Sequence, residues 1–98
     1  MLRITVTYVI GESGRFDLAY YTNQHAALVR RIYGPFGLKR FEVDDDAANR
    51  IVRGHLVFPA SDSLRAELNG VSVELAADAP NYTDVRPTVS VASIVYQA

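Results

Sequence analysis

The chain has 98 residues, 49% of them hydrophobic and 21% charged, and its ten basic and eleven acidic residues give a net charge of −1. This length holds one domain, residues 1–98, and the even charge provides no basic surface for nucleic acid or an anionic membrane. Because the chain has no cysteine, no signal-peptide pattern and no apolar run of membrane-spanning length, we exclude disulfides and thiol chemistry and expect a cytoplasmic protein.

Alternating apolar residues predict a first strand over residues 2–10, and a flexible connection containing Gly11 and Gly14 follows it. A helix comes next, with Asp17 as its N-cap and Phe16 placed to pack onto its first turns. Gly34-Pro35 is expected to end this helix. Its apolar stripe, at steps of three and four, consists of Leu18, Tyr21, His25, Leu28 and Ile32.

Two further strands, a second helix and a last strand are predicted over the rest of the chain. Residues 37–44 and 50–58 are predicted strands, joined by a polar hairpin tip over residues 44–49. Pro59 ends the third strand, and Ala79-Pro80-Asn81 forms a turn before a final strand over residues 85–96. Between them a second helix is predicted, with Ser61 or Asp62 as its cap and a stripe of Leu64, Leu68, Val71 and Leu75.

The order strand, helix, strand, strand, helix, strand predicts an α+β fold of the ferredoxin-like kind. Its four-stranded antiparallel sheet would carry both helices on one face. The other face would bear Val9, Ile51, Val57 and Ile94 among Thr, His and Ser residues. Because such a face is too apolar to be freely solvated, we expect a homodimer that pairs through it.

Three blocks of sequence are similar to the EthD family, and together they cover nearly the whole chain. The first is Arg15-Phe16-Asp17 with Tyr20-Tyr21, His25 and Leu28-Val29, and Gly34-Pro35 follows at the expected distance. The second is Gly54-His55-Leu56-Val57-Phe58. The third is Asp78-Ala79-Pro80-Asn81-Tyr82-Thr83-Asp84, running on to Pro87.

This resemblance implies a dimeric α/β barrel, a fold shared with muconolactone isomerase, cofactor-free polyketide monooxygenases and polyketide cyclases. It also implies a small enzyme without a cofactor, of oxidoreductase, isomerase, cyclase or dehydratase type. Two departures bear on the substrate: Ala27 replaces a common proline, and the stretch from the third strand to Pro80 is short.

His25 is the leading catalytic candidate. It follows Tyr21 by one helical turn on the apolar stripe, so both rings should point at the sheet. A buried imidazole needs a hydrogen-bond partner or a cavity. It is therefore either a core histidine held by a backbone carbonyl or, as the resemblance favours, a general acid or base lining a pocket.

The remaining candidates are weaker. Tyr21 and Tyr82 can polarise a substrate oxygen, Tyr82 can close the mouth of a pocket, and Asp84 is a possible partner for His25. Asn81 can instead satisfy turn geometry, and His55 points to the proposed dimer face. Substrate-binding candidates that would line the pocket with Asn81 are Leu28, Leu64 and Leu68.

The sequence supports no metal site, because the two histidines are thirty residues apart and Asp44-Asp45-Asp46 lacks the pattern of a calcium loop. Two functions stay open. The first is an enzyme that moves protons in a small aromatic or enolisable carbonyl compound through His25. The second is a non-catalytic module that binds an apolar metabolite or assists a neighbouring enzyme. Haem binding is a third possibility by fold analogy alone.

Overall fold

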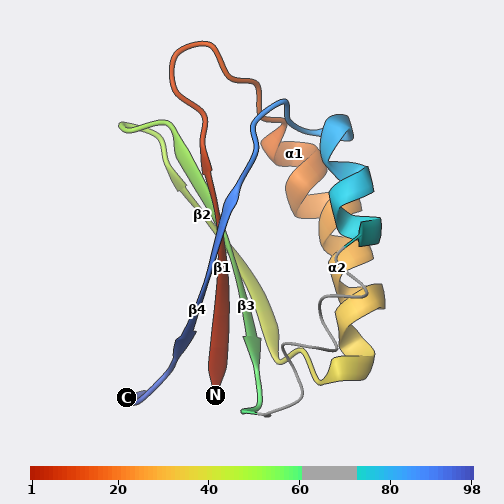
Figure 1. Ribbon diagram of the computed structural model, residues 1–98, viewed down its shortest axis with the longest axis vertical. Coiled ribbons are helices and arrows are strands. Elements are labelled where there is room, and N and C mark those ends of the chain that lie inside the picture. Colours follow the sequence, from red (N-terminus) through yellow and green to blue (C-terminus); the bar gives the residue numbers. More distant parts are fainter. Residues whose placement is uncertain (61–72) are drawn as a thin grey trace.

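The computed structural model describes residues 1–60 and 73–98, and it shows one antiparallel sheet with helices packed against a single face (Figure 1). The strands lie in the order β2-β3-β1-β4. This arrangement confirms the predicted ferredoxin-like fold. The elements are β1 (Leu2–Val9), α1 (Leu18–Tyr20), a π-helical turn (Tyr21–His25), α2 (Ala26–Tyr33), β2 (Arg40–Asp46), β3 (Ile51–Phe58), a helical segment at residues 73–78 and β4 (Thr88–Ser93).

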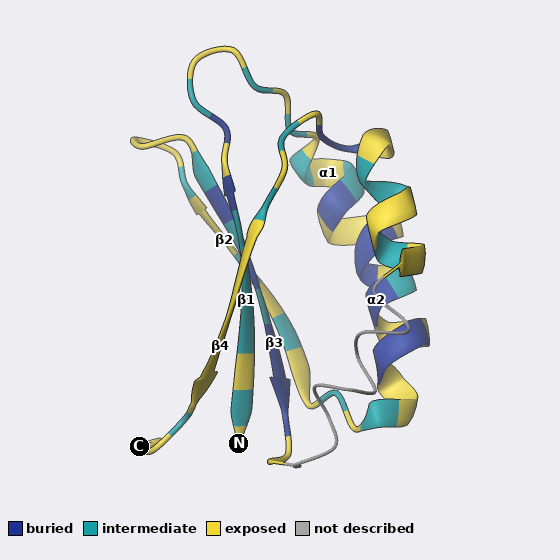
Figure 2. Cartoon of the chain, viewed as in Figure 1, coloured by how far each residue is buried: buried dark blue, intermediate teal, exposed yellow. Residues whose placement is uncertain are grey.

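The core lies between the sheet and the helices, on the face that the alternation in β1 predicts. Buried residues of α2 and β3 form its main cluster, and alternate residues of β1 pack against them. Leu75 also packs there, whereas Leu64, Leu68 and the predicted cap of the second helix lie outside the described residues. β4 is exposed along its whole length, as are the outer sides of the helices (Figure 2).

The first helix begins as predicted but changes phase in the middle. Asp17 caps it by accepting the amide of Tyr20 at 3.0 Å, and the rings of Phe16 and Tyr21 pack 5.0 Å apart. At the π-helical turn, the side chains of Thr22 and Asn23 bond to carbonyls of the preceding turn, at 2.9 and 2.7 Å. Such bonds compete with the regular backbone ladder and widen it.

After the wider turn, the buried face of α2 includes residues beside the predicted stripe. Val29 is buried in α2, and the predicted Leu28 is only half-buried. Ile32 remains buried and Tyr33 joins it. The predicted stripe therefore faces the core, with Leu28 packed against the main cluster and Ile32 buried. The prediction missed Val29 and Tyr33, because a sequence pattern read at 3.6 residues per turn does not include a π-helical turn.

The strand boundaries differ from the prediction at the hairpin and in the last strand. Gly37 has a φ of 86°, so β2 begins only at Arg40 and runs to Asp46. The predicted tip at residues 44–46 is therefore part of the strand. The last strand is shorter than predicted, because Pro87 has no amide proton to donate and β4 begins directly after it. Among the described residues, no helix is long and apolar enough to cross a membrane.

Candidate functional site

The imidazole of His25 lies inside the molecule, as the helical stripe predicts. It sits at the end of the π-helical turn, where the residue is only 4% exposed. The ring stacks on Tyr21 with the centroids 5.0 Å apart and the planes at 13°. The ring of Tyr82 comes within 4.6 Å, centroid to centroid, on a second side. His25 is therefore held between aromatic rings rather than in solvent.

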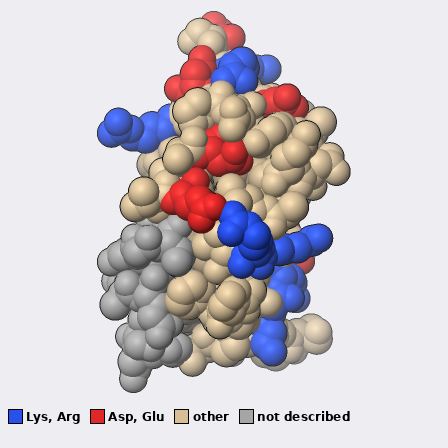
Figure 3. Space-filling view, turned by 90° about the vertical axis from the view of Figure 1, so that its right-hand side faces the viewer, with Lys and Arg blue, Asp and Glu red and all other residues tan. Residues whose placement is uncertain are grey.

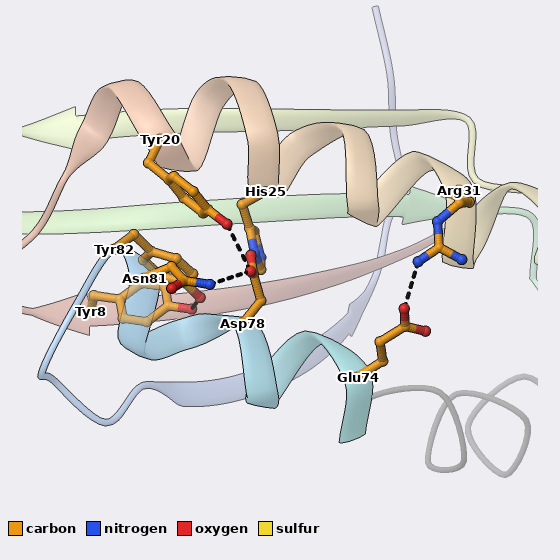
Figure 4. Close-up of polar contacts among 8 residues, drawn as sticks. All are labelled: Tyr8, Tyr20, His25, Arg31, Glu74, Asp78, Asn81 and Tyr82. Atoms are coloured by element: carbon orange, nitrogen blue, oxygen red, sulfur yellow. Dashed lines mark hydrogen bonds and ion pairs between the residues drawn. The ribbon is translucent and has the colours of Figure 1, made fainter.

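The polar partner of His25 is Asp78, at the end of the helical segment of residues 73–78. Its Oδ2 atom lies 2.8 Å from Nδ1 of His25. Its other oxygen, Oδ1, accepts bonds from the hydroxyl of Tyr20 at 2.8 Å and from Nδ2 of Asn81 at 2.9 Å. Figure 4 shows the carboxylate between the first helix and the turn that carries Asn81. Three donors from two parts of the chain thus converge on one carboxylate.

Local sequence explains how Asp78 reaches this place. A 3-10 turn (Ala79–Asn81) follows it directly, with Pro80 in its first turn, and folds the side chain of Asn81 back onto Asp78. The backbone then pairs with the start of the first helix, since the carbonyl of Tyr82 accepts the amide of Asp17 at 2.7 Å. The first and third sequence blocks therefore meet in space, and the site lies at their junction.

The sheet makes room for the Tyr21 ring at a glycine. Gly54 of β3 faces the helices, and a Cβ atom added there would lie 2.3 Å from the hydroxyl oxygen of Tyr21. Any side chain at this position would push the ring away from the sheet, and His25 stacks on the other side of that ring. Gly54 therefore sets the depth at which both rings lie.

The protonation states of the pair follow from burial and hydrogen bonding. Burial lowers the pKa of His25, and the bond to Asp78 offsets only part of this effect. Burial alone would raise the pKa of Asp78, but the bonds from His25, Asn81 and Tyr20 outweigh it and hold the pKa below its ordinary value. At neutral pH the pair is thus a neutral imidazole and a carboxylate. Nδ1 carries the proton toward Asp78, and Nε2 keeps a lone pair.

The buried tyrosines can act only as neutral donors or acceptors. Burial raises the pKa of Tyr21, Tyr82 and Tyr8. The hydroxyl groups of Tyr8 and Tyr82 bond to each other at 2.7 Å. All three phenols therefore keep their protons at neutral pH, so they can donate hydrogen bonds and cannot act as general bases there.

Several predicted site residues lie elsewhere or have other partners. Asp84 does not contact His25; it is exposed, and its Oδ1 accepts the backbone amide of Arg15 at 2.8 Å. Tyr82 is 1% exposed and lies beside the imidazole, so it does not stand at the mouth of a cavity. Leu28 is half-buried and packs against the main cluster. Leu64 and Leu68 lie outside the described residues.

Asp78 is the functional residue that the sequence reasoning did not single out. The sequence does mark Asp78. This residue is the first of the third block similar to the EthD family, and it directly precedes Ala79-Pro80 at the end of a predicted helix. The backbone carbonyl expected to hold a structural His25 is replaced by this carboxylate. Arg31 of α2 and Glu74 of the segment at residues 73–78 form an ion pair, with 2.5 Å between Nη2 and Oε1 (Figure 4). Acidic and basic side chains lie close together on this helix side of the molecule (Figure 3).

The surroundings of His25 limit what the site can hold. Described residues line a hollow on the open sheet face and another beside Tyr20, and His25 borders neither of them. Over residues 1–60 and 73–98, no group of three or more metal-ligating side chains is present. What the geometry offers is a histidine–carboxylate pair with aromatic walls.

Solved structures place this fold among known proteins. An EthD-like protein from Ralstonia eutropha JMP134 superposes with a TM-score of 0.83 and 22% identity, over 99% of this chain and 94% of that one. The chain shares its fold with an EthD-like protein. Rv0793 from Mycobacterium tuberculosis is also similar, with a TM-score of 0.57 and 12% identity over 99% and 97% of the two chains. No protein-family model and no curated protein matches the sequence.

These similarities confirm the EthD-like resemblance for the fold, over nearly the entire chain. They agree with the predicted order of elements and with the sheet order β2-β3-β1-β4. At this level of identity the similarity concerns architecture, and the chemistry has to be argued from the residues themselves.

Proposed function

We propose that the chain is a small acid–base enzyme that works without a cofactor on a small aromatic or enolisable carbonyl compound. The observation that supports this proposal is the 2.8 Å bond between Nδ1 of His25 and the carboxylate of Asp78, in a buried aromatic setting. A neutral histidine oriented by a carboxylate is the arrangement that general-base catalysis requires.

In the proposed reaction, Nε2 of His25 takes a proton from the carbon next to the substrate carbonyl. The electron pair of that C–H bond becomes the enolate, and the imidazolium that forms is stabilised by Asp78, which stays ionised. Returning the proton to the same or a neighbouring atom completes an isomerisation. Loss of a leaving group from the enolate, or its attack on a second carbonyl, would give a dehydratase or a cyclase.

Proton exchange tests this proposal without knowledge of the natural substrate. A panel of aryl ketones and β-keto esters is incubated with the protein in D2O, and loss of the α-proton signal is followed by NMR. We expect exchange above the buffer rate for at least one compound, and loss of that exchange in His25→Gln. His55→Gln is the matched control, because His55 lies on the opposite face of the sheet. Equal exchange by the wild type and His25→Gln for every compound would overturn the proposal.

We also propose that two copies of the chain pair through the open sheet face. Support comes from the shared fold and from residues such as Val9, which is 58% exposed on that face. Analytical ultracentrifugation should give twice the mass of the 10.8 kDa chain. Val9→Glu should shift the mass toward the monomer, whereas Val73→Glu, exposed on the helix side, should not. A monomeric wild type would refute the pairing.

A second candidate function is a non-catalytic binding module. It is favoured by the close packing of His25 between Tyr21 and Tyr82 and by its absence from both surface hollows. In this case the pair of His25 and Asp78 would tie the first helix to the turn after residues 73–78. A compound from the same panel that raises Tm without undergoing exchange would support this function over the enzyme.

A further inference from the structure

A separate hollow lies on the sheet face that points away from the helices, on the left of Figure 1. Its volume is about 590 Å³, which falls within the range of small-molecule sites. It is formed by alternate residues of β2, β3 and β1 together with the chain after β4. Its lining includes Arg3, Arg40, Glu42, Asp44, His55 and Val57.

Two arginines flank the floor of this hollow. Arg3 of β1 and Arg40 of β2 are each the register partner of Val57 in the central strand β3. Register partners point to the same face, so the two guanidinium groups rise on either side of Val57. Nε of Arg40 lies 3.4 Å from Oε2 of Glu42, and both side chains are exposed. Among the described residues, no ion pair is found for Arg3. The hollow therefore offers cationic donors that can accept an additional anion.

Two carboxylates line the hollow beside these arginines, and both have partners: Glu42 lies near Arg40, and Asp44 is bound by His55 and Arg53. Oδ2 of Asp44 lies 2.6 Å from Nε2 of His55, and its Oδ1 lies 3.4 Å from Arg53. The other ring nitrogen of His55 bonds to the hydroxyl of Thr5 at 3.1 Å. This chain of contacts across three strands holds the carboxylate of Asp44 along the sheet. It leaves that carboxylate less free to compete with a ligand for Arg3.

The rest of the hollow is suited to an apolar body. Val57 is 1% exposed although it lies on the open face, so it forms a closed floor. Ile94 and the exposed ring of Tyr96 stand at the side where the chain leaves β4. An apolar floor with two guanidinium groups at its edges matches a ligand with one flat anionic end and one flat apolar end.

We propose that this hollow binds a small organic carboxylate, with its carboxylate on Arg3 and Arg40 and its apolar part against Ile94 and Tyr96. Guanidinium groups bind carboxylates through paired parallel hydrogen bonds, and the apolar side of the hollow favours an anion that carries an apolar group. The site lies on the opposite side of the sheet from His25 and is independent of the acid–base function proposed for that residue. If two copies pair through this face, the hollow lies between them.

An NMR titration of the full chain in its native assembly tests the proposal, with benzoate as the probe. We expect the largest amide shifts at residues 3, 40 and 55–58. Arg3→Gln and Arg40→Gln should each weaken benzoate binding by about tenfold or more, because each removes one charged pair. Arg31→Gln, an exposed arginine on α2, is the matched control and should leave binding unchanged.

Two further ligands complete the test. Benzamide, which has the same shape without the charge, should bind at least about tenfold more weakly than benzoate. Inorganic phosphate, which guanidinium groups also bind through paired hydrogen bonds, lacks the apolar part and should not displace benzoate at equal concentration. The proposal is overturned if benzoate shifts only residues on the helix side, if benzamide binds equally well, if phosphate competes as an adventitious ion would, or if neither arginine variant changes the affinity.

Discussion

Replacing Asp78 with alanine should destabilise the protein strongly, although this residue is not completely buried. The carboxylate accepts bonds from His25, Tyr20 and Asn81, and its side chain is 14% exposed. A buried bond to a charged group contributes about 1.5–3 kcal/mol and an exposed one less, so the three together should cost about 2–4 kcal/mol. For a domain of this size, such a loss lowers Tm by roughly 10–25 °C.

Urea unfolding followed by circular dichroism measures this loss, with Asp84→Ala as the matched control. Asp84 is exposed and accepts one backbone amide, that of Arg15, so its removal should cost only about 0.5–1.5 kcal/mol. The comparison separates the carboxylate that contacts His25 from the one that the sequence suggested. If Asp78→Ala costs no more than Asp84→Ala, the three bonds do not stabilise the fold, and the reasoning about the site is wrong.

Three further predictions concern the same site. Gly54→Ala should destabilise the protein by about 1–3 kcal/mol, because the new Cβ atom would overlap with the Tyr21 hydroxyl. In urea unfolding, the double variant Gly54→Ala/Tyr21→Phe should recover much of this lost stability. Tyr8→Phe alone should cost about 1–3 kcal/mol because it leaves the buried hydroxyl of Tyr82 without its partner, whereas the double variant Tyr8→Phe/Tyr82→Phe should be closer to wild type. Because the pKa of His25 is lowered on folding, the unfolded chain binds the proton more readily, and stability should fall as pH drops below about 6.5. The difference between the wild-type and His25→Asn stability curves isolates this effect, and a flat difference between pH 7 and 5 would contradict it.

The sequence predicted the architecture well because the architecture depends on patterns that repeat. Alternation in residues 2–10 fixed the inward face of β1, and Asp17 with Phe16 marked the start of the first helix. These signals are local, and each has a direct physical cause. The start of the last strand was predicted wrongly at residue 85, although Pro87 carries a local signal against pairing there and β4 begins directly after it.

The candidate site was predictable only in part. His25 and Tyr21 share a helical stripe, so their common inward direction follows from spacing. The partnership of His25 with Asp78 joins residues 53 positions apart and depends on how the turn at Ala79–Asn81 docks against the first helix. A contact between residues so far apart leaves no periodic pattern in the sequence from which it could be predicted. The π-helical turn was equally hidden, because it arises from competing side-chain bonds of Thr22 and Asn23 rather than from an apolar pattern.

The protonation state of His25 shows whether its imidazole and the carboxylate of Asp78 form the described pair. Long-range ¹H–¹⁵N NMR of the histidine side chains identifies which ring nitrogen carries the proton, and the pH dependence gives the pKa. We predict that His25 is neutral at pH 7 with the proton on Nδ1, that its pKa lies below about 6.5, and that Asp78→Asn changes both. A proton on Nε2, or the same titration in the wild type and Asp78→Asn, would contradict the histidine–carboxylate pair on which the account is built.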